Sequence, residues 1–178
     1  TLPTVLQKSD QVALVVYYRG HPLQAAGDFG GFYWTNDYAF NIGVSFKADP
    51  HNYGRVWFPC FDNFVERCSF HFEVTTDSTR RALCNGKEDS VKNGDGTKTW
   101  YWSMSEEIPS YLASVSIANY TPIYDNYIRN SDTLPIILAA VEGDTASLSG
   151  SFVNLKNAIA VFERLFGKYV FNQVGYCV

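Results

Sequence analysis

Histidine is scarce in this chain. Its 178 residues include only three histidines, His21, His51 and His71. None of them has another His, Cys or carboxylate at the spacing of a zinc site such as His-Glu-x-x-His. His71 falls on the polar face of an expected strand, and the other two adjoin prolines, so we assign no metal ligand to this chain.

Catalytic motifs are also missing. There is no Gly-x-Ser-x-Gly elbow, no phosphate-binding Gly-x-x-x-x-Gly-Lys-Ser/Thr loop and no dinucleotide Gly-x-Gly-x-x-Gly after a strand. The carboxylate pair Glu106-Glu107 is adjacent in sequence and expected to face solvent, unlike an acid and a base that share a substrate. The sequence therefore offers no catalytic group.

Charge and long apolar runs are sparse as well. Charged residues make up 18% of the chain and the net charge is −4, which gives no reason to attract a nucleic acid. No apolar run approaches the roughly 20 residues of a membrane helix, and the N-terminus lacks a signal-peptide layout. The chain has no initiator Met, so we interpret it as an excised piece, and its cellular location stays open.

The four cysteines, Cys60, Cys68, Cys84 and Cys177, include no Cys-x-x-Cys pair. Their density is below that of a disulfide scaffold, and free Cys behaves as a small core hydrophobe. We expect buried free thiols.

Aromatic residues are abundant, at 16%, and strand patterns dominate the first three quarters of the chain. Residues 12–18 form a continuous apolar run, which predicts a strand buried on both faces. Residues 67–74 alternate between apolar and polar side chains, which is typical of a half-buried strand. Similar patterns predict strands over 98–104, 111–118 and 136–141. Many short strands between turns indicate an antiparallel β-sandwich or a curved, saddle-like sheet.

The pattern changes after Val141. Apolar residues recur every three or four positions, which predicts one amphipathic helix ending at Gly167, and Val174 begins a short strand. The helical stripe comprises Phe152, Leu155, Ile159, Phe162 and Leu165. We therefore predict a β-rich domain over 1–141 and, over 142–178, the linker, helix and first strand of a second, truncated domain.

The most informative segment runs from Gly54 to Asp62. Bulky residues alternate through it and a proline interrupts it, which predicts a strand at a sheet edge. Arg55 before this strand and Asp62 after it predict a structural ion pair.

This segment resembles the Arg-x-x-Phe-Pro-Cys-x-Asp signature in the N-terminal domain of the aminopeptidase N family of zinc metallopeptidases. The signature positions are Arg55, Phe58, Pro59, Cys60 and Asp62. Further segments resemble the family in the same order, and the resemblance covers almost the whole chain: Gly31-Phe32-Tyr33, Asn85-Gly86, Trp100-Tyr101-Trp102, Pro109-Ser110-Tyr111-Leu112 and Phe166-Gly167-Lys168-Tyr169-Val170-Phe171. Asn63-Phe64 and Lys168-Tyr169-Val170 depart from the family's common Glu-Pro and Pro-Tyr-Pro.

The resemblance implies that zinc, the Gly-x-Met-Glu-Asn motif and His-Glu-x-x-His lie in the parent protein beyond Val178. This chain would then be a non-catalytic scaffold and active-site wall, and its partners would be the missing catalytic domain and the N-terminus of a peptide substrate. In the family a Gln or Glu shortly before the signature Arg holds the substrate's amine. Asp49 is the candidate here, and Lys47 would repel an amine.

A second hypothesis is a standalone β-sandwich module whose aromatic residues bind a carbohydrate or a protein partner. Under the first hypothesis, the apolar side chains of 152–178 have lost partners. They are then expected to be exposed, or covered in a dimer.

Overall fold

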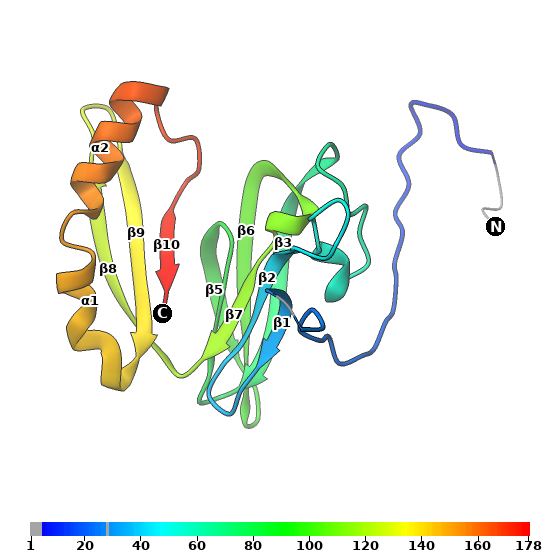
Figure 1. Ribbon diagram of the computed structural model, residues 1–178, viewed down its shortest axis with the longest axis horizontal. Helices are drawn as coiled ribbons and strands as arrows, with labels where there is room; N and C mark the ends of the chain where they lie inside the picture. Colours follow the sequence, from blue (N-terminus) through cyan, green and yellow to red (C-terminus); the bar gives the residue numbers. More distant parts are fainter. Residues whose placement is uncertain (1–4, 28) are drawn as a thin grey trace.

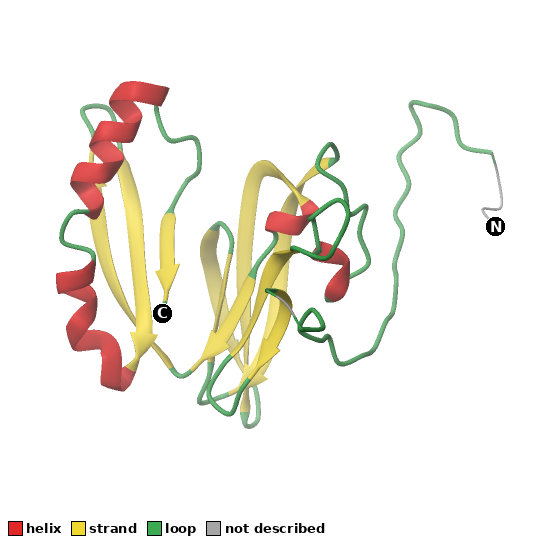
Figure 2. Cartoon of the chain, in the orientation of Figure 1, coloured by secondary structure: helices red, strands yellow, loops and turns green. Residues whose placement is uncertain are grey.

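The computed structural model describes residues 5–27 and 29–178 of the chain. These residues fold mostly into strands, arranged in three sheets, with two α-helices near the C-terminus (Figures 1 and 2). The β-rich fold class predicted from the alternating patterns is therefore confirmed. No helix in the described ranges is long and apolar enough to cross a membrane.

The first sheet has four strands in the order β1-β2-β7-β4, and each neighbouring pair is antiparallel. Their bounds are β1 Gly30–Trp34, β2 Ala39–Ser45, β7 Val115–Ala118 and β4 Arg81–Cys84. Gly43 of β2 lies against the backbone of Tyr111, where an added Cβ would come within 1.6 Å of the carbonyl oxygen. Only glycine fits this close approach.

The second sheet has the antiparallel order β3-β6-β5, with bounds Arg67–Asp77, Thr97–Pro109 and Lys87–Asn93. β6 carries Trp100 and Trp102 into the core, as their shared position on one strand face predicted. The Trp102 indole Nε1 donates to the carbonyl of Ala82 at 3.1 Å, which ties β6 to β4 of the first sheet.

The third sheet contains β8 (Tyr120–Ile128), β9 (Thr133–Val141) and β10 (Val174–Cys177). β8 and β9 form an antiparallel pair, and β10 runs parallel to β9. Helices α1 (Thr145–Ser151) and α2 (Leu155–Phe166) lie along one face of this sheet (Figure 2). Leu148 and Ile159 of these helices are buried against Ile136 of β9 and Val174 of β10. Short 3₁₀ turns cover Gly54–Val56, Ser110–Leu112 and Glu142–Asp144.

The helical region is divided, whereas the sequence predicted a single helix. α1 ends before Phe152, and α2 begins at Leu155. α1 is rich in serine, threonine and glycine, which favour helix interiors weakly, so the short α1 depends on burying Leu148 under β9.

The predicted division between residues 141 and 142 stays a prediction. It falls between β9 and the 3₁₀ turn that leads into α1. Buried side chains from both sides of this point share one cluster.

Residues 12–18 do not form the predicted buried strand. They follow an extended path away from the sheets (Figure 1), and Tyr17 is 94% exposed. The pattern has the residue types of a strand, but a strand also needs a neighbour to hydrogen bond with. No backbone bond joins this segment to another described residue.

The predicted strand over 111–118 is also shorter than expected. A 3₁₀ turn occupies Ser110–Leu112, and the strand covers only Val115–Ala118. Pro109 precedes the turn in an extended conformation, and the Ala113 N–H donates to the Ser110 carbonyl at 3.1 Å. This local bond replaces the ladder bonds of a strand.

Candidate functional site

The segment Gly54–Asp62 folds as a loop, not as the predicted strand. It starts with the 3₁₀ turn and then runs without regular structure. The predicted ion pair is confirmed: Arg55 Nη1 lies 2.7 Å from Asp62 Oδ2. The Asp62 side chain is 5% exposed, while that of Arg55 is 45% exposed. The loop is therefore closed on itself by a pair whose acidic partner is buried.

The Asp62 carboxylate accepts hydrogen bonds from backbone N–H groups as well as from the Arg55 guanidinium. Its carboxylate accepts from the backbone N–H of Gly54 at 3.1 Å and of Arg55 at 3.2 Å. Burial raises the pKa of Asp62, but the hydrogen bonds from Asn52, Arg55 and Gly54 outweigh this effect and lower it overall. Asp62 is thus held as a carboxylate that organises the loop.

The loop is also anchored to the 3₁₀ turn Ser110–Leu112, which precedes β7. Ser110 Oγ donates to the Phe61 carbonyl at 2.9 Å, and the Asn52 side chain donates to the Asp62 carbonyl. Phe58 is half-buried, with its ring centroid 6.3 Å from that of Phe70, and Pro59 is exposed. Burial raises the pKa of the half-buried Cys60 thiol. These positions have contacts suited to a structural role.

Lys47 and Asp49, the predicted substrate-contacting residues, lie in the exposed turn after β2. Lys47 Nζ donates to the Ala26 carbonyl at 3.0 Å, so its charge is held against the chain's own backbone. Asp49 makes no hydrogen bond or ion pair with any residue that the structure describes. Its role in binding an amine stays a prediction.

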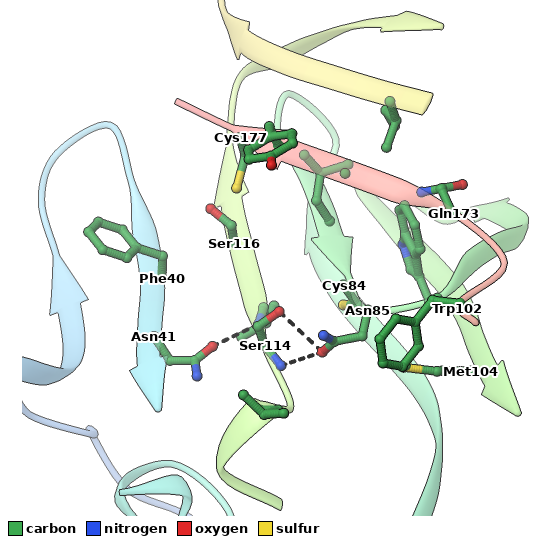
Figure 3. Close-up of a pocket in the computed structure, with 18 of the residues that line it drawn as sticks. Phe40, Asn41, Cys84, Asn85, Trp102, Met104, Ser114, Ser116, Gln173 and Cys177 are labelled. Atoms are coloured by element: carbon green, nitrogen blue, oxygen red, sulfur yellow. Dashed lines mark hydrogen bonds between the residues drawn. The ribbon is translucent and has the colours of Figure 1, made fainter. Parts of the chain in front are cut away.

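The described residues line a cavity of about 600 Å³ between β10 and the sheets that contain β4, β6 and β7 (Figure 3). Its volume falls within the usual range of small-ligand sites. None of the described residues that line it carries an ionisable acid or base of the Asp, Glu, Lys, Arg or His type. Representative lining residues are Phe40, Asn85, Trp102, Met104, Ser116 and Cys177.

Two asparagines fix the floor of this cavity. Asn85 Oδ1 accepts from the Ser114 hydroxyl at 3.1 Å, and Asn41 Oδ1 accepts from the Val115 N–H at 2.7 Å (Figure 3). Asn41 Nδ2 also donates to the Ala113 carbonyl at 3.0 Å. The sequence indicated only a turn at Asn85 and nothing at Asn41, because their partners are more than 25 positions away.

The thiols differ from the prediction of buried cysteines. All four are free, but Cys68 and Cys177 are exposed. Cys68 lies where the β3–β6 register shifts, so the alternating pattern does not turn it inward. Cys84 is half-buried in the cavity wall, and burial raises its pKa to about 12.

The described side chains do not fit a zinc ion. No three His, Cys, Asp or Glu side chains among them gather closely enough to hold a metal. His21 stacks on Trp34 with ring centroids 4.8 Å apart, and His51 Nδ1 lies 3.2 Å from the Ser45 carbonyl.

Residues 1–112 match the sequence profile of the peptidase M1 N-terminal domain. The chain belongs to this family. The match contains the Arg55–Asp62 loop, the strands of the first sheet up to β4, and the second sheet. The resemblance drawn from the signature residues is thereby confirmed.

Curated relatives of this M1 N-terminal domain match over short segments. Leucine aminopeptidase 2 of Vanderwaltozyma polyspora is 38% identical over 65 residues, which is 36% of this chain and 10% of that protein. Transcription initiation factor TFIID subunit 2 of Gallus gallus is 26% identical over 111 residues, or 60% of this chain and 10% of that protein. The chain thus spans about a tenth of the length of these relatives.

Solved structures share the fold of this M1 domain. An M1 zinc metallopeptidase from Deinococcus radiodurans superposes with a TM-score of 0.75 at 18% identity, covering 89% of this chain and 36% of that one. Aminopeptidase A of Legionella pneumophila gives a TM-score of 0.72 at 21% identity, covering 86% of this chain and 18% of that one. At these identities the likeness establishes the fold.

Proposed function

We propose that this chain is the non-catalytic N-terminal domain of a zinc-dependent aminopeptidase, serving as a scaffold and as one wall of the active site. The observation that carries the proposal is the family match over 1–112, which includes the closed Arg55–Asp62 loop. The fold shared with M1 zinc metallopeptidases supports it. The zinc and its ligands then belong to the catalytic part of the parent protein, in which this domain's partner is the catalytic domain.

Within this proposal Asp49 binds the α-amine of the peptide substrate. Its carboxylate is exposed and has no cationic partner among the described residues, so it is available to an ammonium group. A free Lys47 side chain would repel that amine. Its Nζ instead donates a hydrogen bond to the Ala26 carbonyl, which holds the positive charge at that carbonyl. In the full-length enzyme, D49N should raise KM for aminoacyl anilides about tenfold, and K47A should not.

The proposal is tested by comparing this chain with the full-length product of its gene. The full-length protein should bind one zinc ion per molecule and hydrolyse aminoacyl anilides. The purified 178-residue chain should do neither. Zinc content by mass spectrometry and release of the chromogenic aniline measure both properties. Robust hydrolysis by the 178-residue chain, or a full-length protein without a zinc motif, would refute the proposal.

A second candidate is a non-catalytic module that binds a carbohydrate or a protein partner. The matches to TFIID subunit 2 favour the protein-binding form, because they cover 60% and 41% of this chain, against 36% for the leucine aminopeptidase. TFIID subunit 2 is by its name part of a multiprotein assembly. A full-length protein that lacks a zinc motif and co-purifies with stable partners would favour this candidate.

We further propose that the exposed side of α2 is covered by another chain or domain. Phe162, Leu165 and Phe166 are 61%, 62% and 80% exposed on this helix. Exposed apolar patches of this kind mark association surfaces. In the isolated chain the covering partner is a second copy, so a concentration-dependent dimer is expected by light scattering. F166S should weaken it, and a strictly monomeric chain would argue against this surface.

A further inference from the structure

Two of the free cysteines flank a tight reversal of the chain. Cys60 lies near the end of the signature loop, Gly54–Asp62, and Cys68 lies near the start of β3. Between them the Asn63 Oδ1 accepts from the backbone N–H of Val65 at 2.9 Å and of Glu66 at 2.7 Å. Such a side-chain acceptor closes a turn. Cys60 and Cys68 therefore belong to two legs that run in opposite directions.

A ring contact shows that the two legs lie side by side. The ring centroids of Phe58 and Phe70 are 6.3 Å apart. Cys60 comes two residues after Phe58 on the first leg, and Cys68 comes two residues before Phe70 on the second. On opposed extended legs, residues at equal distances from a contact face each other. This alignment brings Cys60 opposite Cys68.

The end of β6 holds both legs at this point. Arg67, the residue before Cys68, is aligned with Pro109. The next residue, Ser110, donates its hydroxyl hydrogen bond to the Phe61 carbonyl at 2.9 Å, directly after Cys60. Two consecutive residues of the chain thus contact the neighbours of the two cysteines, which keeps the legs together.

The two thiols differ in exposure but share an environment. Cys68 is exposed and Cys60 is half-buried. Burial raises the pKa of the Cys60 thiol, and the nearby Asp62 and Cys68 raise it further. Burial and the Glu107 carboxylate likewise raise the pKa of Cys68. Both groups are therefore protonated near neutral pH, and the pair stays a dithiol until an oxidant reaches the exposed member.

We infer that Cys60 and Cys68 form a redox-active pair, which a small disulfide such as oxidised glutathione converts into an intramolecular disulfide. The new bond ties the signature loop to β3, on the far side of the turn from Arg55. The site goes beyond the proposed function, because it needs neither zinc nor the catalytic part of the parent protein.

The exchange takes two steps. The Cys68 thiolate first attacks one sulfur of oxidised glutathione. The glutathione S–S bond breaks, a mixed disulfide forms at Cys68, and one glutathione leaves with the proton that Cys68 released. The Cys60 thiolate then attacks the Cys68 sulfur and displaces the second glutathione. Two protein thiols are thereby oxidised, and one glutathione disulfide is reduced to two glutathione molecules.

The experiment incubates the 178-residue chain with mixtures of reduced and oxidised glutathione at pH 8 and then blocks the remaining thiols with N-ethylmaleimide. Trypsin cleaves after Arg67, so Cys60 and Cys68 fall in different peptides, 56–67 and 68–80. Mass spectrometry should find these peptides joined in monomeric protein, and dithiothreitol should release them.

Two variants provide matched controls. C60S should stop at the mixed disulfide between Cys68 and glutathione, because the second step has lost its nucleophile. C177S removes the other exposed thiol and should give the joined peptides as the wild type does. If C60S fails to fold, the peptide map of the wild type still decides the question.

The glutathione ratio at half oxidation measures how far the fold brings the two thiols together. Their effective concentration should be at least about tenfold higher in the native chain than in concentrated guanidinium chloride. By linkage, a tenfold preference raises the Tm of the oxidised chain by about 3–6 °C.

Equal effective concentrations in the two states would overturn the inference. So would a wild-type Cys68 that stops at the mixed disulfide, or joined peptides that link Cys68 to Cys177 or to a second copy. None of these outcomes changes the zinc and hydrolysis assays, which address the proposed function separately.

Discussion

Removing the buried carboxylate of the signature loop should destabilise the fold strongly. In D62A the guanidinium of Arg55 and two backbone N–H groups lose an acceptor that sits 2.7–3.2 Å from them. Breaking a buried charged network by deleting one partner costs about 3–5 kcal/mol. Because Arg55 is 45% exposed and can be hydrated, we expect the low end, about 3 kcal/mol.

The reverse deletion should be much milder. R55A leaves Asp62 bonded to the N–H groups of Gly54 and residue 55, so only the partly exposed ion pair is lost, at about 1 kcal/mol. For a domain of this size 1 kcal/mol corresponds to roughly 2–4 °C in Tm. The expected decreases in Tm are therefore about 6–12 °C for D62A and about 2–4 °C for R55A.

Thermal and urea unfolding monitored by circular dichroism measure these values, and the double variant gives the coupling energy. The pH dependence is a second check. The folded-state pKa of Asp62 lies below the ordinary value of 3.8, so its stabilisation is present above that value and is lost as the pH falls through the folded pKa. The stability difference between wild type and D62N should shrink below pH 4. Equal costs for D62A and R55A, or a pH-independent difference, would refute the reasoning.

Three further outcomes are expected. Iodoacetamide at pH 8 should label the exposed Cys68 and Cys177 rapidly and Cys84 slowly, since burial raises the Cys84 pKa to about 12; mass spectrometry of the digested protein reads the rates, and equal rates would contradict the burial. G43A should destabilise by more than about 2 kcal/mol, because its Cβ would meet the Tyr111 backbone, whereas G143A, with open space around it, should be nearly neutral in the same urea titration. R129A should cost about 3 kcal/mol, since this arginine, 9% exposed, pairs with Glu163 of α2 at 2.7 Å, and a loss below 0.5 kcal/mol would show that α2 is held by packing alone.

Local patterns predicted β3, β6, β9, β10 and part of β7, and they missed the other strands of the described residues. The alternation around Phe70 and Phe72 and the paired Trp100 and Trp102 predicted β3 and β6, because a half-buried strand requires a period of two. The signature residues also predicted the Arg55–Asp62 pair. Each of these features depends on residues close in sequence, so the sequence contains the necessary information.

The errors occurred where pairing decides the structure. Residues 12–18 have strand composition but no neighbouring strand among the described residues, and the Gly54–Asp62 segment closes on itself through Asp62. In the first case a backbone partner is missing among the described residues, and in the second the partners lie within the loop. The availability of hydrogen-bond partners therefore outweighs strand propensity, which is a weak preference.

The sequence by itself determined the family, through a signature whose residues lie within eight positions, and the β-rich class, through the period of its apolar residues. Only the tertiary structure decided where the cavity lies and that β10 pairs in parallel with β9. Asn41 and Ala113, or Ala139 and Val178, are hydrogen-bonded although they are far apart in the chain, and the direction in which each backbone group points is set by the neighbour that the fold provides.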